Sequence, residues 1–470
     1  MRALFLNFAV TSINFNVALP LPQALIQSLQ GAPGFDEQAF IKVHNDSDAL
    51  TSVRYNPAKL ARYKGDLPID KVSWNPYGYY LPERPSFTHD PLFHGGLYYV
   101  QEAGSQFLWE TLSQTSDDNK QARVLDLCAA PGGKTTLLSS FFTNGWVVAN
   151  EVIKSRVNVL AENVTKWGTG NIVVTNNDPQ HFAVLKNYFD VVLVDAPCSG
   201  SGLFRRDNDA IAEWSEDAVQ LCSRRQQRIL ADIYPALKQD GLLIYSTCSY
   251  SPQEDEEILD WLTDNFALEN IPLKTKDEWN ITKVSSFKNN AEGYKFYPDK
   301  TRSEGFFIAV FRKKDGALYA NENYFQKLSV PDKRETAEAL NWIDPQSDCQ
   351  VIKHKETLLA VPGKYAADIT FLQQHLYLKK AGIAIGEIKN KGLVPAHDLA
   401  VSSIFAADIP YVQLDKAQSL QYLKRREPEL EHAVKGWALA QYEGLNLGWM
   451  KILPDRVNNY YPNEWRILKD

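Results

Sequence analysis

Short apolar, β-branched runs alternate with amphipathic segments through the middle third of the chain. The five runs span residues 122–128, 145–151, 171–178, 189–197 and 240–248. Apolar residues at helical spacing occupy the intervals, over 134–142, 154–168 and 223–239. This alternation predicts βαβ units in an α/β fold, with a parallel sheet that is buried on both faces. A further apolar run at 304–314 is predicted to be a late strand that closes the sheet.

The segments on either side of this sheet have different patterns. Residues 1–95 begin with helical spacing and continue into a Pro- and Tyr-rich stretch, and polarity rises again near 313–324. Residues 330–470 end in Gly-punctuated short strands, a pattern typical of a small β-rich module. The length of 470 residues leaves room for about three domains. We predict them at 1–95, 96–315 and 330–470.

Chemically capable side chains stand where the five predicted strands end. They are Cys128, Glu151, Asp178, Asp195 and Cys248. A parallel sheet binds ligands beyond the carboxyl ends of its strands. Loops are polar in general, so chance accounts for part of this set. Carboxylates and thiols gathered on one edge nevertheless indicate a functional site.

The turn after the first strand, LDLCAAPGGKTT at 125–136, has some features of a nucleotide-phosphate loop. That loop begins with a glycine six positions before its lysine, but Cys128 stands there. The acidic edge would also repel a pyrophosphate, whereas Glu151 suits ribose hydroxyls and Asp178 suits the amino group of adenine. The set predicts S-adenosylmethionine, which carries cationic sulfonium and ammonium groups in place of phosphates.

Two cysteines lie in short, Ser-rich loops after the fourth and fifth strands. Cys198 is in DAPCSGSG (195–202) and Cys248 is in STCSYSPQEDEE (246–257). One such thiol is usually an inert core residue, but two at adjacent strand ends indicate nucleophilic chemistry. A thiolate that adds to carbon 6 of a pyrimidine makes carbon 5 nucleophilic enough to accept a methyl group. Asp195 would lie near ring nitrogen 3 and stabilise the charge that the addition creates.

The motifs VLDLCAAPGGKTT, VDAPCSGSGLFRRD and STCSYSPQEDEEIL resemble those of the RNA cytosine carbon-5 methyltransferases. In particular the chain is similar to the bacterial RsmF-type ribosomal-RNA enzymes, with VRYNPAKL (53–60), YYVQEAGSQF (98–107) and EGFF as further shared elements. The resemblance implies a Rossmann-like, S-adenosylmethionine-dependent methyltransferase core. It also implies a small N-terminal α/β domain that binds RNA and a C-terminal PUA-like RNA-binding module. The end of that module is similar to the segment LGWMKILPDRVNNYYPNEWRI of this chain.

The resemblance further implies roles for individual residues. Cys248 would be the nucleophile and Cys198 would assist release of the methylated RNA, an order that the residues alone leave open. The cofactor would be held by Cys128, Ala129, Ala130, Pro131, Gly132, Gly133, Lys134, Glu151, Asp178 and Asp195. The family often has a histidine where this chain has Asp299, so Asp299 receives no role.

Charge adds a constraint on how RNA is bound. The net charge is −7, so phosphates must meet a local basic surface. Candidates near the predicted edge are Arg205, Arg206, Arg54 and Lys59; further basic groups are Arg224, Arg225 and Arg228, and Lys424 to Arg426. Tyr79, Tyr80, Tyr98 and Tyr99 are candidates to stack on bases, although core packing is the commoner role.

The five cysteines are scattered and form no CxxC pair, which argues against a disulfide framework and a structural zinc site. No stretch approaches the roughly 20 apolar residues of a membrane span. We expect a cytoplasmic monomer with no metal. Residues 1–17 are weakly signal-like and match nothing in the family.

Three alternatives to ribosomal-RNA methylation stay open at this level. The substrate could be transfer RNA, the chain could be a non-catalytic RNA-binding protein, or the glycine turn could belong to a P-loop NTPase. The region from about residue 330 is predicted to serve RNA affinity rather than chemistry.

Overall fold

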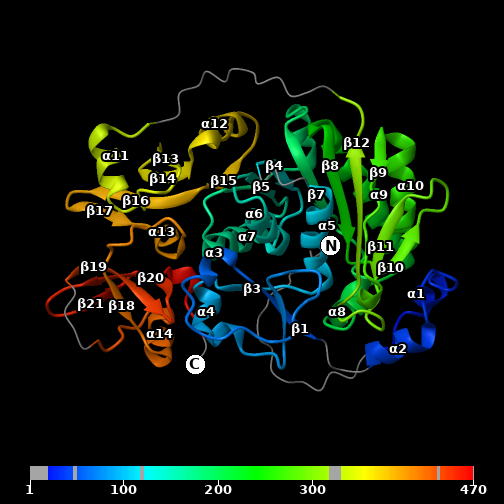
Figure 1. Ribbon diagram of the computed structural model, residues 1–470, viewed down its shortest axis with the longest axis horizontal. Coiled ribbons are helices and arrows are strands. Elements are labelled where there is room, and N and C mark those ends of the chain that lie inside the picture. Colours follow the sequence, from blue (N-terminus) through cyan, green and yellow to red (C-terminus); the bar gives the residue numbers. More distant parts are fainter. Residues whose placement is uncertain (1–18, 46–49, 117–120, 317–329, 431–434, 469–470) are drawn as a thin grey trace.

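Five parallel strands form the centre of the largest sheet (Figure 1). The computed structural model describes residues 19–45, 50–116, 121–316, 330–430 and 435–468. In spatial order the parallel strands are β8 (Leu237–Thr247), β7 (Phe189–Asp195), β4 (Arg123–Asp126), β5 (Trp146–Asn150) and β6 (Ile172–Thr175). The predicted runs therefore all form strands, and their carboxyl ends lie on one edge because the strands are parallel.

Antiparallel strands extend this sheet on both sides. On the β8 side lie β12 (Phe306–Lys313), β11 (Glu292–Phe296) and β10 (Thr282–Ser285), with β9 (Leu268–Asn270) also paired to β12. The late strand predicted at 304–314 is confirmed as β12, which pairs antiparallel with β8. At the opposite edge β15 (Leu378–Ala381) pairs antiparallel with β6.

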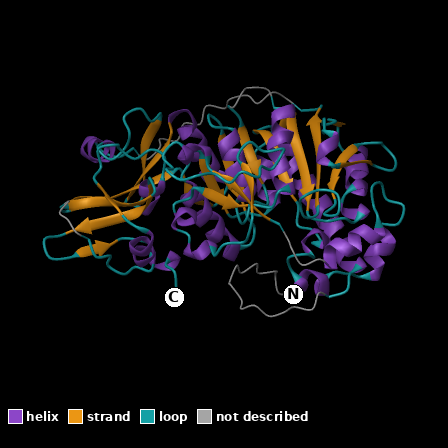
Figure 2. Cartoon of the chain, turned by 60° about the horizontal axis from the view of Figure 1, so that its bottom comes forward, coloured by secondary structure: helices purple, strands orange, loops and turns teal. Residues whose placement is uncertain are grey.

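Alternate residues of each central strand face opposite layers. In β7, Val191 and Leu193 contact one buried cluster, whereas Val192 and Val194 contact the other. The first layer contains α5 (Leu108–Thr115), α6 (Gly133–Phe141) and α7 (Lys154–Trp167). The second contains α9 (Glu216–Ile233), α10 (Glu256–Asn265) and α12 (Ala366–His375). The central strands therefore lie between helices, as the apolar runs predicted (Figure 2).

One predicted helix is shorter than expected. The pattern over 223–239 predicts a single helix, but α9 ends at Ile233 and β8 begins at Leu237. Pro235 lacks the N–H group that a continuing helix needs, and residues Tyr234–Ala236 form a single 3₁₀ turn instead.

The N-terminal region divides between two places. Helices α1 (Gln23–Ser28) and α2 (Glu37–Asn45) pack with α8 (Asn208–Glu213) beside the loop that follows Cys198. A separate antiparallel sheet contains β2 (Gly78–Leu81), β1 (Thr51–Tyr55) and β3 (Tyr98–Val100), with the short helices α3 (Pro57–Leu60) and α4 (Pro91–His94). Residues 1–18, including the unmatched start, lie outside the described residues.

The C-terminal region contains two four-stranded sheets. The first comprises β13 (Cys349–His354), β14 (Thr357–Pro362), β16 (Ile383–Lys389) and β17 (Gly392–Pro395), near α11 (Lys333–Leu340) and α13 (His397–Val401). The second comprises β18 (Tyr411–Gln413), β19 (Gly436–Tyr442), β20 (Leu445–Ile452) and β21 (Val457–Asn459), with α14 (Lys416–Leu423). Short strands are thus present where the Gly-punctuated tail predicted them.

Part of this C-terminal region belongs structurally to the catalytic sheet. Strand β15 completes its edge, and Asp368 of α12 forms an ion pair with Arg123 of β4 at 2.7 Å. The carbonyl of Tyr377 accepts from the backbone N–H of Asn176 (3.1 Å) and from Asn177 Nδ2 (3.1 Å). Segments α12 and β15 therefore also stabilise the catalytic sheet, and the role of the region from about residue 330 in RNA affinity stays a prediction. The three-part division at 1–95, 96–315 and 330–470 remains a proposal, and its predicted boundary at 313–324 lies partly outside the described residues.

Membrane insertion has a specific structural requirement, a long apolar helix. Within the described ranges, none of the helices combines the length and the apolarity needed to cross a bilayer.

Candidate active site

A tight turn, here called the cofactor turn (residues 128–134), joins β4 to α6 at the carboxyl edge of the sheet. Gly132 has a φ of +112°, a conformation that glycine adopts readily and other residues rarely do. A Cβ atom on Gly133 would lie 3.2 Å from the Tyr99 ring. The two glycines therefore allow the turn to reverse direction while Tyr99 packs against it.

Side chains from three segments hold the carbonyl groups of this turn. Each donates to a different carbonyl: Arg156 Nη2 to Ala130 (2.6 Å), Asn163 Nδ2 to Pro131 (2.9 Å), Thr136 Oγ1 to Gly132 (2.9 Å) and Arg54 Nη2 to Gly133 (3.1 Å). A turn supported in this way is organised before any ligand binds, which lowers the entropic cost of binding.

Three carboxylates converge behind the turn. Asp126 and Glu151 are almost fully buried, and Asp195 is partly exposed at the end of β7. Burial, followed by the charges of Glu151, Asp126 and Asp195, raises the pKa of the Cys128 thiol well above its ordinary value. Cys128 is therefore a packing residue of the cofactor turn and is poorly suited to act as a nucleophile.

Lys134 points to a carboxylate. Its Nζ donates to Asp195 Oδ2 at 2.8 Å, and Asp195 Oδ1 accepts from Ser246 Oγ at 2.7 Å. Burial alone would lower the pKa of Lys134, but Asp195 and then Cys248 hold it above its usual value. In a phosphate loop the lysine would bind a phosphate. Here the ammonium of Lys134 is paired with Asp195 at the acidic carboxyl edge of the sheet, so the phosphate-loop alternative gains no support.

The predicted thiols meet between the ends of β7 and β8. Their sulfur atoms lie 2.9 Å apart, and both side chains are partly exposed. The hydrogen bond to Cys248, together with burial, raises the pKa of Cys198 well above its ordinary value. The ammonium of Lys134 interacts with Cys248, whereas the carboxylate of Glu254 interacts with Cys198. The raised pKa keeps Cys198 protonated as a thiol, whereas Cys248 lies beside the positive charge of Lys134.

The carboxylate set fits a cofactor that carries positive charge. Among the described residues, Asp126 Oδ2 accepts from Thr135 Oγ1 (2.6 Å), while the buried Oδ1 atom has no hydrogen-bond partner. An orphaned acceptor of this kind suits the ammonium or sulfonium of S-adenosylmethionine. Glu151 Oε1 accepts from the N–H of Ile153 (2.8 Å), and Asp178 Oδ1 accepts from Arg228 Nη1 (3.2 Å).

A first prediction concerns Asp126, whose pKa is raised to about 7 chiefly by burial. A carboxyl group that binds its proton more tightly in the folded state than in the unfolded state adds to the stability of the protein. This contribution is complete at pH values below the pKa of the unfolded state, and it is lost as the pH rises through about 7. We therefore expect Asp126→Asn to raise the melting temperature relative to the parent at pH 8 but hardly at pH 4. Thermal melts at both pH values measure this.

The exposed carboxylate Asp277 supplies the matched control, since Asp277→Asn makes the same chemical change away from the site. An equal rise in melting temperature at both pH values would contradict a buried ionisation.

The Asp126→Asn variant should also bind S-adenosylhomocysteine more weakly than the parent in calorimetry at pH 8, with ATP as the control ligand.

Several basic residues predicted to contact RNA are engaged inside the protein. Arg205 and Arg206 both pair with the buried carboxylate of Glu304, at 3.3 and 3.1 Å. Arg54 is fully buried and donates to the cofactor turn, to Gln101 Oε1 and to Thr136 Oγ1. The predicted phosphate contacts of Arg54 and Arg205 are wrong, because their guanidinium groups are directed into the protein and bind acceptors there. Arg206 stays a candidate, since about 30% of its side chain is exposed.

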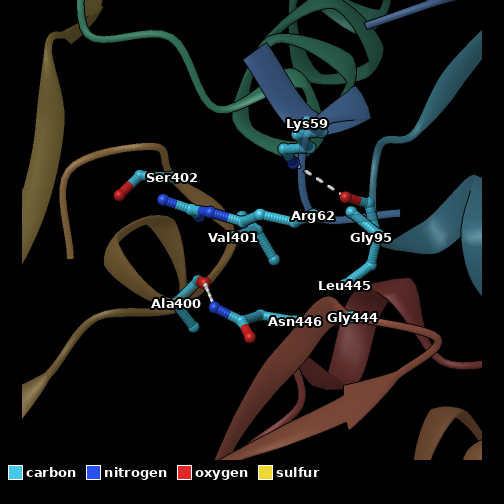
Figure 3. Close-up of a pocket in the computed structure, with 9 residues that line it drawn as sticks. All are labelled: Lys59, Arg62, Gly95, Ala400, Val401, Ser402, Gly444, Leu445 and Asn446. Carbon is cyan, nitrogen blue, oxygen red and sulfur yellow. Dashed lines mark hydrogen bonds between the residues drawn. The ribbon is translucent and has the colours of Figure 1, made fainter. Parts of the chain in front are cut away.

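Lys59 lies at a junction of three parts of the chain (Figure 3). Its ammonium donates to the carbonyls of Gly95 (2.7 Å) and Lys166 (2.6 Å), and burial lowers its pKa to about 7. A cavity of about 10 Å³ separates it from α13 and from the start of β20, room for about one water molecule. Lys59 therefore joins segments together, and its predicted role in an RNA groove is wrong.

The predicted stacking tyrosines are mainly structural. Tyr79, Tyr80 and Tyr98 are buried, and Tyr55 packs edge-on against Tyr79 at 5.4 Å. Tyr99 is half-buried against Gly133. Core packing, the commoner role, is what the structure shows for the first three.

Sequence reasoning missed Arg156, Asn163 and Glu254. The first two lie on α7 in a segment recognised only as helical, where polar residues usually face solvent. Glu254 stood in the quoted motif of the Cys248 loop, but nothing in its spacing distinguished it from its acidic neighbours. Asp299 is half-buried, and its Oδ1 atom has no hydrogen-bond partner among the described residues. In the described part of the chain, no group of three or more His, Cys, Asp or Glu residues could hold a metal ion.

Comparison with protein families finds three matching models along the chain. Residues 113–312 match the 16S rRNA methyltransferase RsmB/F family, and residues 21–103 match the N-terminal domain of 16S rRNA methyltransferase RsmF. Residues 410–467 match the methyltransferase RsmF PUA domain. The last two matches coincide with the β1–β3 region and with the sheet of β18 to β21.

Individual proteins show the same likeness. The ribosomal RNA small subunit methyltransferase F of Aeromonas salmonicida (strain A449) is 30% identical over 421 residues, which cover 84% of this chain and 85% of that protein. The protein of the same description from Escherichia coli O139:H28 (strain E24377A / ETEC) is 30% identical over 387 residues, 78% of each chain. The crystal structure of PH0851 superposes with a TM-score of 0.55 at 25% identity, covering 62% of this chain and 66% of that one.

Proposed function

The chain belongs to the RsmB/F family of 16S rRNA methyltransferases, and from that premise we propose how its residues methylate carbon 5 of a cytosine in 16S ribosomal RNA. S-adenosylmethionine supplies the methyl group. The observation that carries the proposal is the pair of sulfur atoms 2.9 Å apart beside the cofactor turn. Cys198 holds its proton tightly, whereas Cys248 lies beside the ammonium of Lys134, and this difference gives each thiol its own role.

Cys248 is the nucleophile of this proposal. Its sulfur adds to carbon 6 of the cytosine, and the electron pair of the carbon 5–carbon 6 bond then attacks the methyl group. The ammonium of Lys134 lies beside Cys248, where its positive charge can stabilise the sulfur while it carries negative charge during the addition. Asp195, held by Lys134 and Ser246, would lie beside the pyrimidine near ring nitrogen 3.

Cys198 assists the release step. After methyl transfer, carbon 5 must lose its proton and the carbon 6–sulfur bond must break, with its electron pair returning to Cys248. As Cys198 gives its proton to the departing sulfur of Cys248, its own sulfur becomes a thiolate and takes the proton from carbon 5, so the double bond between carbons 5 and 6 forms again. The close contact between the sulfurs supports such a relay.

The cofactor residues of the proposal are the cofactor turn with Glu151, Asp178 and Asp195. Glu151 would accept hydrogen bonds from the ribose hydroxyls, and Asp178 would accept one from the adenine amino group.

The PUA-like module, residues 410–467, would hold RNA at a distance from the target, with Arg425 and Arg426 exposed after α14. We also propose that the enzyme acts in the cytoplasm as a monomer.

Bisulfite sequencing of total RNA tests the function directly, because carbon 5 methylation protects cytosine from conversion. We expect one protected cytosine of 16S rRNA to become convertible in cells that lack the gene. Restoring the gene should restore protection, and a Cys248→Ala copy should not. Loss of protection in transfer RNA with 16S rRNA unchanged would favour the transfer-RNA alternative.

A further inference from the structure

A single buried carboxylate connects the two thiol loops. Glu254 ends a 3₁₀ turn (Pro252–Glu254) just after Cys248, and none of its surface is exposed. Its Oε1 atom accepts from the backbone N–H of Ser199 (2.8 Å) and from Gln226 Nε2 (3.2 Å). Its Oε2 atom accepts from Ser199 Oγ (2.5 Å) and Ser249 Oγ (2.6 Å). Ser199 follows Cys198 and Ser249 follows Cys248, so the carboxylate bridges the residues next to both sulfurs.

The two thiols depend on this bridge unequally. Cys248 directly follows β8, and its carbonyl also accepts from the N–H of Gly202 at 2.8 Å. Cys198 lies in a loop without regular structure, where both donors of Ser199 are directed to Glu254. The carbonyl of Pro197 accepts from Gln226 Nε2, which itself donates to Glu254. Removing the carboxylate would therefore loosen Cys198 more than Cys248.

We propose that Glu254 is a positioning residue that holds Cys198 against Cys248 and thereby controls release of the methylated RNA. The inference rests on the thiol roles given under the proposed function. Glu254 is shielded from solvent by both loops and acts through Ser199 and Ser249, so it touches no reacting atom.

The order of chemical steps makes the consequence specific. Addition and methyl transfer use Cys248, whose strand and Gly202 contact remain when Glu254 is lost. Release uses Cys198, and a displacement of about 1 Å can slow a positioned step by about a hundredfold. A loosened Cys198 should therefore leave RNA attached through Cys248.

Glu254→Ala tests the inference on a denaturing gel with target RNA and S-adenosylmethionine. We expect slower turnover and a covalent adduct several-fold more abundant than in the parent, as for Cys198→Ala. The adduct must disappear in Glu254→Ala combined with Cys248→Ala. A purely structural defect would lower turnover and adduct together, and that result would overturn the proposal.

Two further variants separate geometry from charge. In Glu254→Gln the amide oxygen can still accept from Ser199 N–H and Gln226, and both serine hydroxyls can accept from the amide nitrogen. This variant should release RNA nearly as the parent does. Glu257 is an exposed carboxylate on α10, and Glu257→Gln is the matched control, which should leave the amount of adduct as in the parent.

A milder change keeps the test decisive if Glu254→Ala does not fold. Ser199→Ala removes one of the two Ser199 donors and leaves the carboxylate in place, so it should raise the adduct by a smaller factor. An adduct no greater than in the parent would overturn the proposal. Absence of any adduct in both the parent and Cys198→Ala would instead refute the covalent function itself.

Discussion

Cys248→Ala protein is expected to transfer no methyl group to RNA and to form no covalent adduct. The alanine removes the only sulfur that the proposed scheme joins to carbon 6, and without that bond carbon 5 is too weak a nucleophile. Cys198→Ala should behave differently, because addition and methyl transfer precede the step that uses Cys198. It is expected to attack, transfer the methyl group and then stall with RNA attached through Cys248.

A denaturing gel of each variant with target RNA and S-adenosylmethionine separates these outcomes. Cys349→Ala is the matched control, since Cys349 lies at the start of β13, away from the thiol pair, and should behave as the parent. A persistent adduct with Cys248→Ala would reverse the assignment. Full activity of both variants would show that the two thiols take no part in catalysis.

Removing the chain after residue 330 is expected to destroy the catalytic domain, whereas removal after residue 409 should mainly weaken RNA binding. The longer deletion takes away β15 and α12, together with the preceding strands β13 and β14. This part of the chain contributes these buried side chains to the second layer of the sheet: Ile352, Val361, Tyr365, Ile369, Phe371, Leu372 and Leu376. Burial of one such side chain contributes about 1.5–3 kcal/mol. Their combined loss is comparable to the whole stability of a domain, about 5–15 kcal/mol.

Thermal melts, calorimetry with S-adenosylhomocysteine and RNA titrations on both truncated proteins measure the difference. The shorter deletion removes the buried side chains of Leu439 and Trp449 and the contact of Asn446 with Ala400, so a fall in melting temperature is expected that is smaller than for the longer deletion. Cofactor binding should survive, and the dissociation constant for RNA should rise. A well-folded protein ending at residue 330 that binds the cofactor normally would contradict the role assigned to β15 and α12.

The basic surface illustrates why sequence reasoning has limits. Arg54, Lys59 and Arg205 were natural candidates for phosphate contacts because basic side chains usually lie on the surface. In the folded chain their partners are Gly133 O, Lys166 O and Glu304, which are distant along the sequence. Spacing along a chain contains no information about such partners.

The sequence by itself determined the parallel sheet, its carboxyl edge and the chemistry gathered there, because strand periodicity and turn composition are local properties. It placed the cofactor turn, both thiols, Glu151, Asp178 and Asp195 after the ends of these strands, and it predicted the closing strand β12. Only the tertiary structure decided which charges surround each thiol, because Lys134 and Glu254 come from different loops and approach through folding. The pairing of β15 with β6 was likewise decided at that level, since about 200 residues separate the two strands and no local pattern specifies an edge partner.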